Sequence, residues 1–222
     1  MFSKADHEAI SEAIKSAEMR TSGEIVVIVS SQPHRYGGTA LSLAALAALA
    51  LPFTAVLFGW SPADLLPDWD TLDARSHEQR SLEVLICVQA LTFAITLALG
   101  WFTPLARAVT PEGLRRDRVH ATALTQFRAR GLDATQGRTG VLLYVDEPDH
   151  VAEVIADTGV FDKVPPEHWA DTIEALTQGF RRGQPVAGLT AAIALAGEVL
   201  ATHFPSKGTA DRNDLPDHLI EI

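Results

Sequence analysis

The chain has 222 residues and a formal net charge of −10, with 28 acidic against 18 basic side chains. This acidic balance argues against nucleic acid or an anionic membrane surface as the main partner of the soluble part. The single cysteine, Cys87, excludes an intramolecular disulfide and a metal site built from several cysteines. The sequence has no Walker loop, no Gly-x-Gly-x-x-Gly, no Gly-x-Ser-x-Gly and no His-Glu-x-x-His, so the familiar enzyme signatures are absent.

The N-terminal segment predicts one helix followed by one buried strand. Ser3 and Asp6 form the pattern of a capping box, and apolar residues then recur at helical spacing, with Glu18 on the solvated face. Thr21-Ser22-Gly23 ends the helix. Residues 24–29 are a run of β-branched residues after one Glu, which suits a strand buried on both faces.

Two stretches without Asp, Glu, Lys or Arg, residues 36–63 and 84–106, interrupt this soluble pattern. Each exceeds the roughly 20 helical residues that cross a hydrocarbon core. Trp60 and Trp101 lie near their ends, where an indole favours the headgroup layer. The alternative is a pair of buried core helices, although globular helices of this length normally carry a polar face. We predict a transmembrane hairpin, with residues 61–81 as a short acidic external loop.

The basic residues around the hairpin predict its orientation. The loop carries two cations, Arg75 and Arg80. By contrast, the other side of the two spans is flanked by Lys15, Arg20, Arg35, Arg107, Arg115, Arg116 and Arg118. Because basic flanks resist translocation, we expect a multi-pass anchor with both termini and the soluble domain in the cytoplasm.

The sequence after the hairpin predicts a helix, a β-hairpin and two further helices. Thr110-Pro111-Glu112 opens the first helix and Gly131 ends it. The later elements are strands at 141–145 and 151–156, a helix from Pro165 or Pro166 to Arg182, and a helix from Pro185. The two strands are expected to pair antiparallel. The polar tail after Pro205 is expected to be disordered.

Four segments, residues 22–27, 137–143, 154–160 and 197–205, occur in an order that resembles the TPM domain family. The family takes its name from a thylakoid lumen protein, a photosystem II repair protein and a modulator of levamisole-type receptors; it was formerly a bacterial domain of unknown function. The likeness is greatest to bacterial membrane-anchored members, which implies the bacterial inner (plasma) membrane.

The resemblance implies an α/β fold: an α/β/α sandwich with a small mixed sheet, here interrupted by the two-helix transmembrane hairpin. The expected organisation is therefore a TPM-like soluble domain made of residues 1–35 and 107–205. The hairpin occupies residues 36–106, and residues 206–222 form a polar tail.

Carboxylates near strand ends are the candidate metal ligands. Glu24 begins the first predicted strand, Asp146 follows the second together with Glu147 and Asp149, and Asp157 ends the third. If the three strands lie side by side, some of these oxygens converge at one edge and suit Ca²⁺ or Mg²⁺, with Asp157, Glu24 and Asp146 as the leading candidates. The alternative is that they are solvated turn acids.

Three cationic side chains are candidates for a structural contact or an anion contact. Arg138 stands beside a Gly at the start of a strand, as Glu24 does, which suggests a structural ion pair between them. His120 follows Arg116 by one helical turn, so the two form either a small anion site or an ordinary helix surface.

The resemblance implies two functions: divalent-cation binding in the assembly or repair of membrane complexes, and acid phosphatase activity. A phosphatase needs an identifiable nucleophile or a dense metal site, and the sequence shows neither. We therefore favour a membrane-anchored accessory or binding module that acts in assembly or maintenance of a membrane protein complex. A metal-dependent hydrolase is the alternative. The expected partners are the lipid bilayer and another membrane protein, with no nucleic acid.

Overall fold

The computed structural model describes residues 2–59, 74–135, 137–206, 215 and 217–222. The chain divides into two compact units. The first, which we call the sandwich unit, comprises residues 1–33 and 112–222, and the second, the hairpin unit, comprises residues 34–111. Each unit is described below by itself.

A mixed four-stranded sheet in the order β3-β2-β1-β4 forms the centre of the sandwich unit. β1 (Glu24–Ser30) runs parallel to β2 (Gly140–Asp146) and to β4 (Leu219–Glu221), whereas β3 (Val151–Ala156) is antiparallel to β2. Because β1 and β2 pair in parallel along their whole length, with Ser30 opposite Asp146, their carboxyl ends lie at the same end of the sheet.

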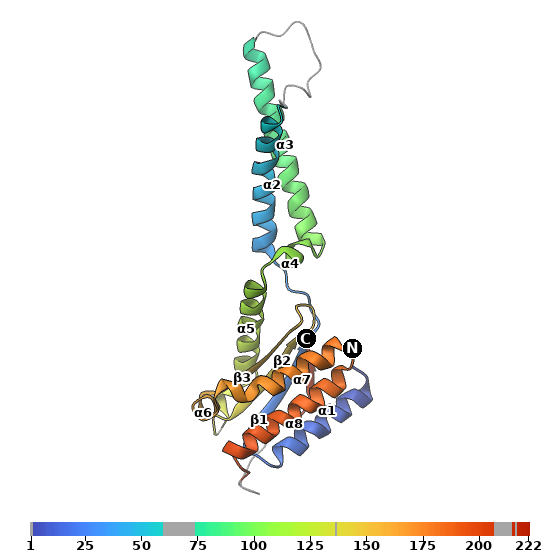
Figure 1. Cartoon of the computed structure of the whole chain (residues 1–222), viewed down its shortest axis with the longest axis vertical. Helices are drawn as coiled ribbons and strands as arrows, with labels where there is room; N and C mark the ends of the chain where they lie inside the picture. Colours follow the sequence, from blue (N-terminus) through green and yellow to red (C-terminus); the bar gives the residue numbers. More distant parts are fainter. Residues whose placement is uncertain (1, 60–73, 136, 207–214, 216) are drawn as a thin grey trace. The chain divides into compact units, whose positions relative to one another are not determined.

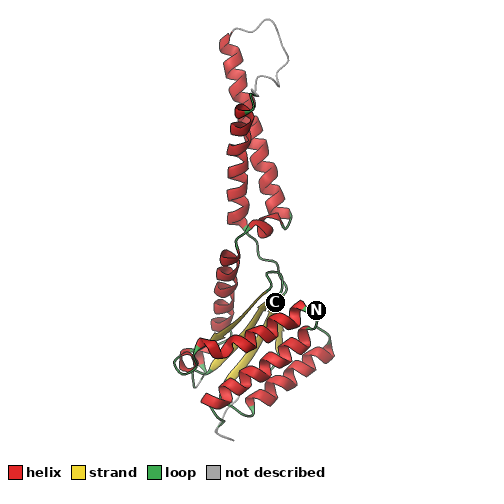
Figure 2. Cartoon of the chain, viewed as in Figure 1, coloured by secondary structure: helices red, strands yellow, loops and turns green. Residues whose placement is uncertain are grey.

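Helices cover both faces of this sheet (Figures 1 and 2). α1 (Lys4–Glu18), α7 (Ala170–Arg181) and α8 (Pro185–His203) cover one face, and α5 (Glu112–Ala129) covers the other. The short α6 (Thr158–Phe161) follows β3, and 3-10 turns stand at Leu132–Ala134 and Pro166–Trp169. The expected α/β/α sandwich is confirmed.

The alternation of β1 side chains explains why the whole strand is apolar. Ile25, Val27 and Val29 point into the core shared with α1, α7 and α8. Val26 and Ile28 point into the core shared with α5. All five are at most 2% exposed, so a strand with helices on both faces has no solvated side on which polar residues would be needed.

The prediction that everything after Pro205 is disordered is wrong for the end of the chain. Leu219–Glu221 form β4, with Leu219 opposite Val27. The pairing extends further, because Ser31 N–H donates to Ile222 O at 2.9 Å and Ile222 N–H donates to Val29 O at 3.0 Å. A free edge of β1 thus recruits a segment whose own sequence is too short to signal a strand.

The hairpin unit contains α2 (Gly37–Leu57), α3 (Ala74–Phe102) and the short α4 (Leu105–Val109). α3 begins inside the predicted external loop. Residues 61–73 of that loop, and Trp60 before it, lie outside the described residues. α2 and α3 approach closely at Gly100, where an added Cβ would come within 2.8 Å of Ala40 Cβ. Their outer faces expose large apolar side chains, including Phe53 and Ile86.

Among the described residues, three helical segments are long and apolar enough to cross a membrane: Gly37–Leu57, Gln79–Phe102 and Pro185–His203. The third is α8, whose Leu189, Ile193 and Leu200 are fully buried in the sandwich core, so its apolar character is explained by packing. The first two keep their apolar surfaces exposed within the hairpin unit, which is consistent with membrane association.

Candidate functional site

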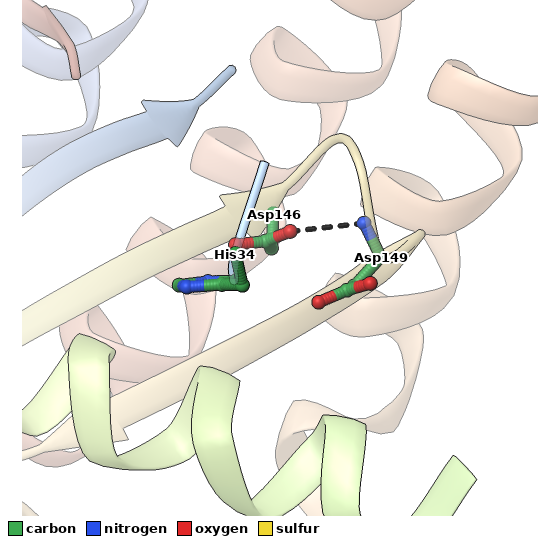
Figure 3. A group of neighbouring side chains, drawn as sticks. All are labelled: His34, Asp146 and Asp149. Atoms are coloured by element: carbon green, nitrogen blue, oxygen red, sulfur yellow. Dashed lines mark hydrogen bonds between the residues drawn. The ribbon is translucent and has the colours of Figure 1, made fainter. Parts of the chain in front are cut away.

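Two buried carboxylates stand at the end of β2, in a turn that we call the acidic turn (residues 146–150). Asp146 is 0% exposed and Asp149 is 4% exposed. Asp149 N–H donates to Asp146 Oδ1 at 2.9 Å. Figure 3 shows both carboxyl groups and also labels His34, from the segment that follows β1. Asp side chains are rarely buried to this degree, so the turn is a candidate site rather than an ordinary solvated loop.

The acidic turn is held in place by the end of β1. Glu147 N–H donates to Ser30 O at 2.9 Å, which continues the β1–β2 pairing beyond the strands. Ser31 Oγ donates to Glu147 Oε2 at 3.2 Å. His150 has a φ of 54°, a left-handed conformation that closes the turn into β3. The carboxyl ends of parallel strands are where open α/β sheets bind ligands, and this turn occupies that position.

Asp157 is buried at the opposite end of the sheet and has a structural role there. It caps α6 by accepting the Thr158 N–H at 2.6 Å, and it accepts two hydrogen bonds from Arg138, from Nη2 at 2.9 Å and from Nε at 3.1 Å. Burial alone would raise the pKa of Asp157, but the hydrogen bonds from Arg138 and Thr158 N–H outweigh it and hold that pKa below its ordinary value.

The structure does not bring Glu24, Asp146 and Asp157 together. Glu24 is opposite Gly140 at the start of β1 and β2, whereas Asp146 is opposite Ser30 at their end. Six strand residues at about 3.3 Å each separate the two ends by about 20 Å. Because β3 is antiparallel to β2, Asp157 returns to the Gly140 end. The partner of Arg138 is accordingly Asp157 instead of the expected Glu24. Metal binding by Glu24, Asp146 or Asp157 stays a prediction.

Glu18 is a half-buried acid that the sequence pattern placed on the solvated face of α1. Its Oε1 accepts the Ile25 N–H at 2.8 Å, where the strand begins. Burial raises the pKa of Glu18 from the ordinary 4.5 to about 8, and the nearby Glu24 and Asp217 raise it further against the effect of the Ile25 hydrogen bond. Its neighbours come from β1 and from the segment before β4, which a helical periodicity does not reveal.

A groove of about 980 Å³ follows β3 along the edge of the sheet, between α5 and α7, and is called here the β3 groove. Arg116 and His120, predicted as neighbours one turn apart, both line it. His120 Nδ1 lies 2.9 Å from Glu153 Oε2, and Arg116 Nη2 lies 3.9 Å from Glu112 Oε2. Asp149 lines the same groove, so the acidic turn forms one end of it.

Comparison with known proteins agrees with this architecture, an α/β/α sandwich whose sequence is interrupted by two long apolar helices. A family model described as TPM domain matches residues 106–199, from α4 through most of α8. Residues 106–199 of the chain therefore match a TPM domain. α1 and β1 lie outside the matched residues, yet they complete the same sandwich.

A solved structure similar to the chain is the NMR structure of the BA42 protein from the psychrophilic bacterium Bizionia argentinensis. The TM-score is 0.58 at 21% sequence identity, and the alignment covers 100% of this chain and 96% of that chain. A likeness at this identity establishes the fold alone. No curated protein matches the sequence.

Proposed function

We propose that the protein is a membrane-anchored TPM module that binds a divalent cation, Ca²⁺ or Mg²⁺, at the acidic turn, and that it acts in assembly or maintenance of a membrane protein complex. The observation that carries the cation proposal is the burial of both Asp146 and Asp149 at the carboxyl end of β2. The hairpin helices, long and apolar enough to span a bilayer, support the anchor.

Electrostatics favour a cation at this turn. Two carboxylates brought together out of solvent repel each other and lose hydration, and a divalent cation offsets both effects. Carboxylate oxygens are also the ligands that Ca²⁺ and Mg²⁺ prefer. The turn is rigidly anchored to β1 through Glu147 and Ser30, which reduces the conformational entropy lost on binding.

A titration of the full-length protein in detergent micelles tests the cation proposal. After removal of metals with EDTA, Ca²⁺ or Mg²⁺ should raise the melting temperature in a concentration-dependent manner. Asp149→Asn should abolish this rise. Asp162→Asn changes an exposed acid at the end of α6 and should keep the rise, which makes it the matched control. An unchanged melting temperature up to millimolar Ca²⁺ and Mg²⁺ would refute the cation proposal.

The hydrolase alternative has one observation in its favour. Asp149 lines the same groove as Arg116 and His120, so a cation at the turn and these side chains would face a common ligand. Turnover of a generic phosphomonoester in the presence of the bound cation, lost in Asp149→Asn and in His120→Ala, would establish this reading. Cation binding without turnover supports the accessory module.

A further inference from the structure

β3 is an edge strand whose outer side has unused backbone groups. It pairs with β2 on one side, and it is the terminal strand of the described sheet. Asp157 N–H donates to Gly140 O, so by the antiparallel alternation the N–H and C=O groups of Val151, Glu153 and Ile155 point towards β2. Those of Ala152 and Val154 therefore point outwards, away from β2.

The β3 groove lies along this outer side. β3 forms its floor, α5 forms one wall through Arg115, Arg116 and His120, and α7 forms the other wall through Ile173 and Phe180. A second copy of the chain does not fit, because two edges recessed between helices cannot approach each other closely enough to pair. An extended single segment fits, because it fills the groove and satisfies the outward groups of Ala152 and Val154.

At the Val151 end of the groove three arginines, Arg115, Arg116 and Arg181, outnumber two acids, Glu112 and Asp149. An added Cβ on Gly140 would meet Leu132 O at 2.5 Å, so the end of α5, shortly before Leu132, lies near the start of β2. The first turns of α5, with Arg115 and Arg116, therefore lie at the opposite end of the sheet. His120 pairs with Glu153, which places Arg116, one turn earlier, beside Val151.

The opposite wall contributes a third guanidinium at this end. Arg181, in the last turn of α7, lines the groove and makes no hydrogen bond or ion pair with the residues that the structure describes. Arg116 is 70% exposed and only 3.9 Å from Glu112, a separation typical of a weak surface pair. Arg181 can therefore engage a carboxylate of a bound segment directly, and Arg116 can do so by exchanging its weak pair with Glu112.

We infer that the β3 groove binds an extended acidic segment of a partner protein as an additional strand, antiparallel to β3. The outward N–H and C=O groups of Ala152 and Val154 bond to its backbone, its apolar side chains pack on Ile173 and Phe180, and acidic residues at its carboxyl end face Arg115, Arg116 and Arg181. We infer the antiparallel direction because antiparallel strand pairs are slightly more stable than parallel ones. This inference rests on the accessory-module part of the proposed function and is independent of cation binding.

Fluorescence anisotropy with the full-length protein in detergent micelles and EDTA tests the inference without any cation. The probe is a labelled peptide, Thr-Val-Thr-Val-Thr-Glu-Glu, and the control peptide ends in Lys-Lys. The acidic peptide should bind about fivefold or more tightly than the control peptide, and added salt should reduce the difference. Failure of both peptides to bind at millimolar protein concentration would overturn the inference, whatever the result of the Ca²⁺ titration.

Variants of the groove distinguish strand addition from other binding. Val154→Pro removes an N–H that points away from β2, which an edge strand tolerates, and should weaken binding about tenfold or more. Arg181→Glu should weaken binding of the acidic peptide about fivefold. Arg128→Glu reverses an exposed charge on α5 outside the groove and should change nothing. If Val154→Pro does not fold, Arg181→Glu decides. Binding unaffected by every folded groove variant would overturn the inference.

Discussion

The half-buried acid Glu18 predicts an unusual loss of stability as the pH rises. In the folded state burial raises the pKa of Glu18 to about 8, against an ordinary 4.5. Between these two values the folded protein holds a proton that the unfolded chain has released. Because the folded state then binds more protons than the unfolded state, the free energy of unfolding decreases as pH rises from about 5 to about 8.

The size of this effect follows from the two pKa values. The slope cannot exceed about 1.4 kcal/mol per pH unit. Glu18 keeps part of its surface in solvent, and solvent screening reduces the total loss in the free energy of unfolding between pH 5 and pH 8 to roughly 2 kcal/mol. Glu18→Gln removes the titrating group and keeps an oxygen for the Ile25 N–H, so the variant should gain about this amount relative to wild type at pH 8 and little at pH 5.

Urea unfolding between pH 5 and pH 8, followed by far-ultraviolet circular dichroism, measures the difference in the free energy of unfolding between Glu18→Gln and wild type. Glu8→Gln is the matched control, because Glu8 stands on the same helix with its side chain 70% exposed and should leave the pH dependence unchanged. A Glu18→Gln variant with the same slope as wild type, or with lower stability at pH 8, would refute the reasoning.

Three further predictions concern the ion pair, the membrane topology and the separability of the two units. Asp157→Asn should cost roughly 1–2 kcal/mol in urea unfolding at pH 7, because it removes the carboxylate that accepts the hydrogen bonds of the solvent-exposed Arg138, while Asp162→Asn should cost little. The contribution of Asp157 to the free energy of unfolding should disappear as the pH falls below about 4, because the pKa of Asp157 is lowered in the folded state. An Asp157→Asn variant as stable as wild type at pH 7 would contradict the structural role of Asp157. Alkaline phosphatase fused after Ile222 should be inactive and an insertion near Asp70 active; the reverse pattern would contradict the predicted topology. Replacement of residues 36–106 by a short Gly/Ser linker should leave a protein that unfolds cooperatively, because loop length changes stability only slowly, and the absence of a cooperative transition would contradict a self-sufficient sandwich.

The main elements of the sandwich were predictable because each has a strong local signal. β1 and β2 are apolar runs, and β3 is bounded by residues 147–150 and by Gly159. Gly131 and Gly183 adopt φ values of 73° and 68°, which only glycine adopts without strain, so the predicted helix ends are accurate. The resemblance to the TPM family supplied the layer order.

The features that the sequence did not predict depend on contacts between distant segments. β4 has three residues and forms because β1 offers a free edge. Glu18 is desolvated by its position against β1 and the segment before β4, so its helical position alone is misleading. The candidate metal ligands were placed at strand ends correctly, but the directions of the strands determine which ends meet. Asp146 and Asp149 share an end, and Glu24 and Asp157 lie at the other.

The chain leaves and re-enters the sandwich unit at one end of its sheet. The chain leaves the sandwich unit after β1, at its carboxyl end, and returns at the start of α5. Both points belong to the end of the sheet that carries the acidic turn and the cationic end of the β3 groove. The opposite end, with Arg138 and Asp157, is closed by a structural ion pair. The acidic turn and this end of the β3 groove therefore share the end of the sheet at which the chain leaves and re-enters the sandwich unit.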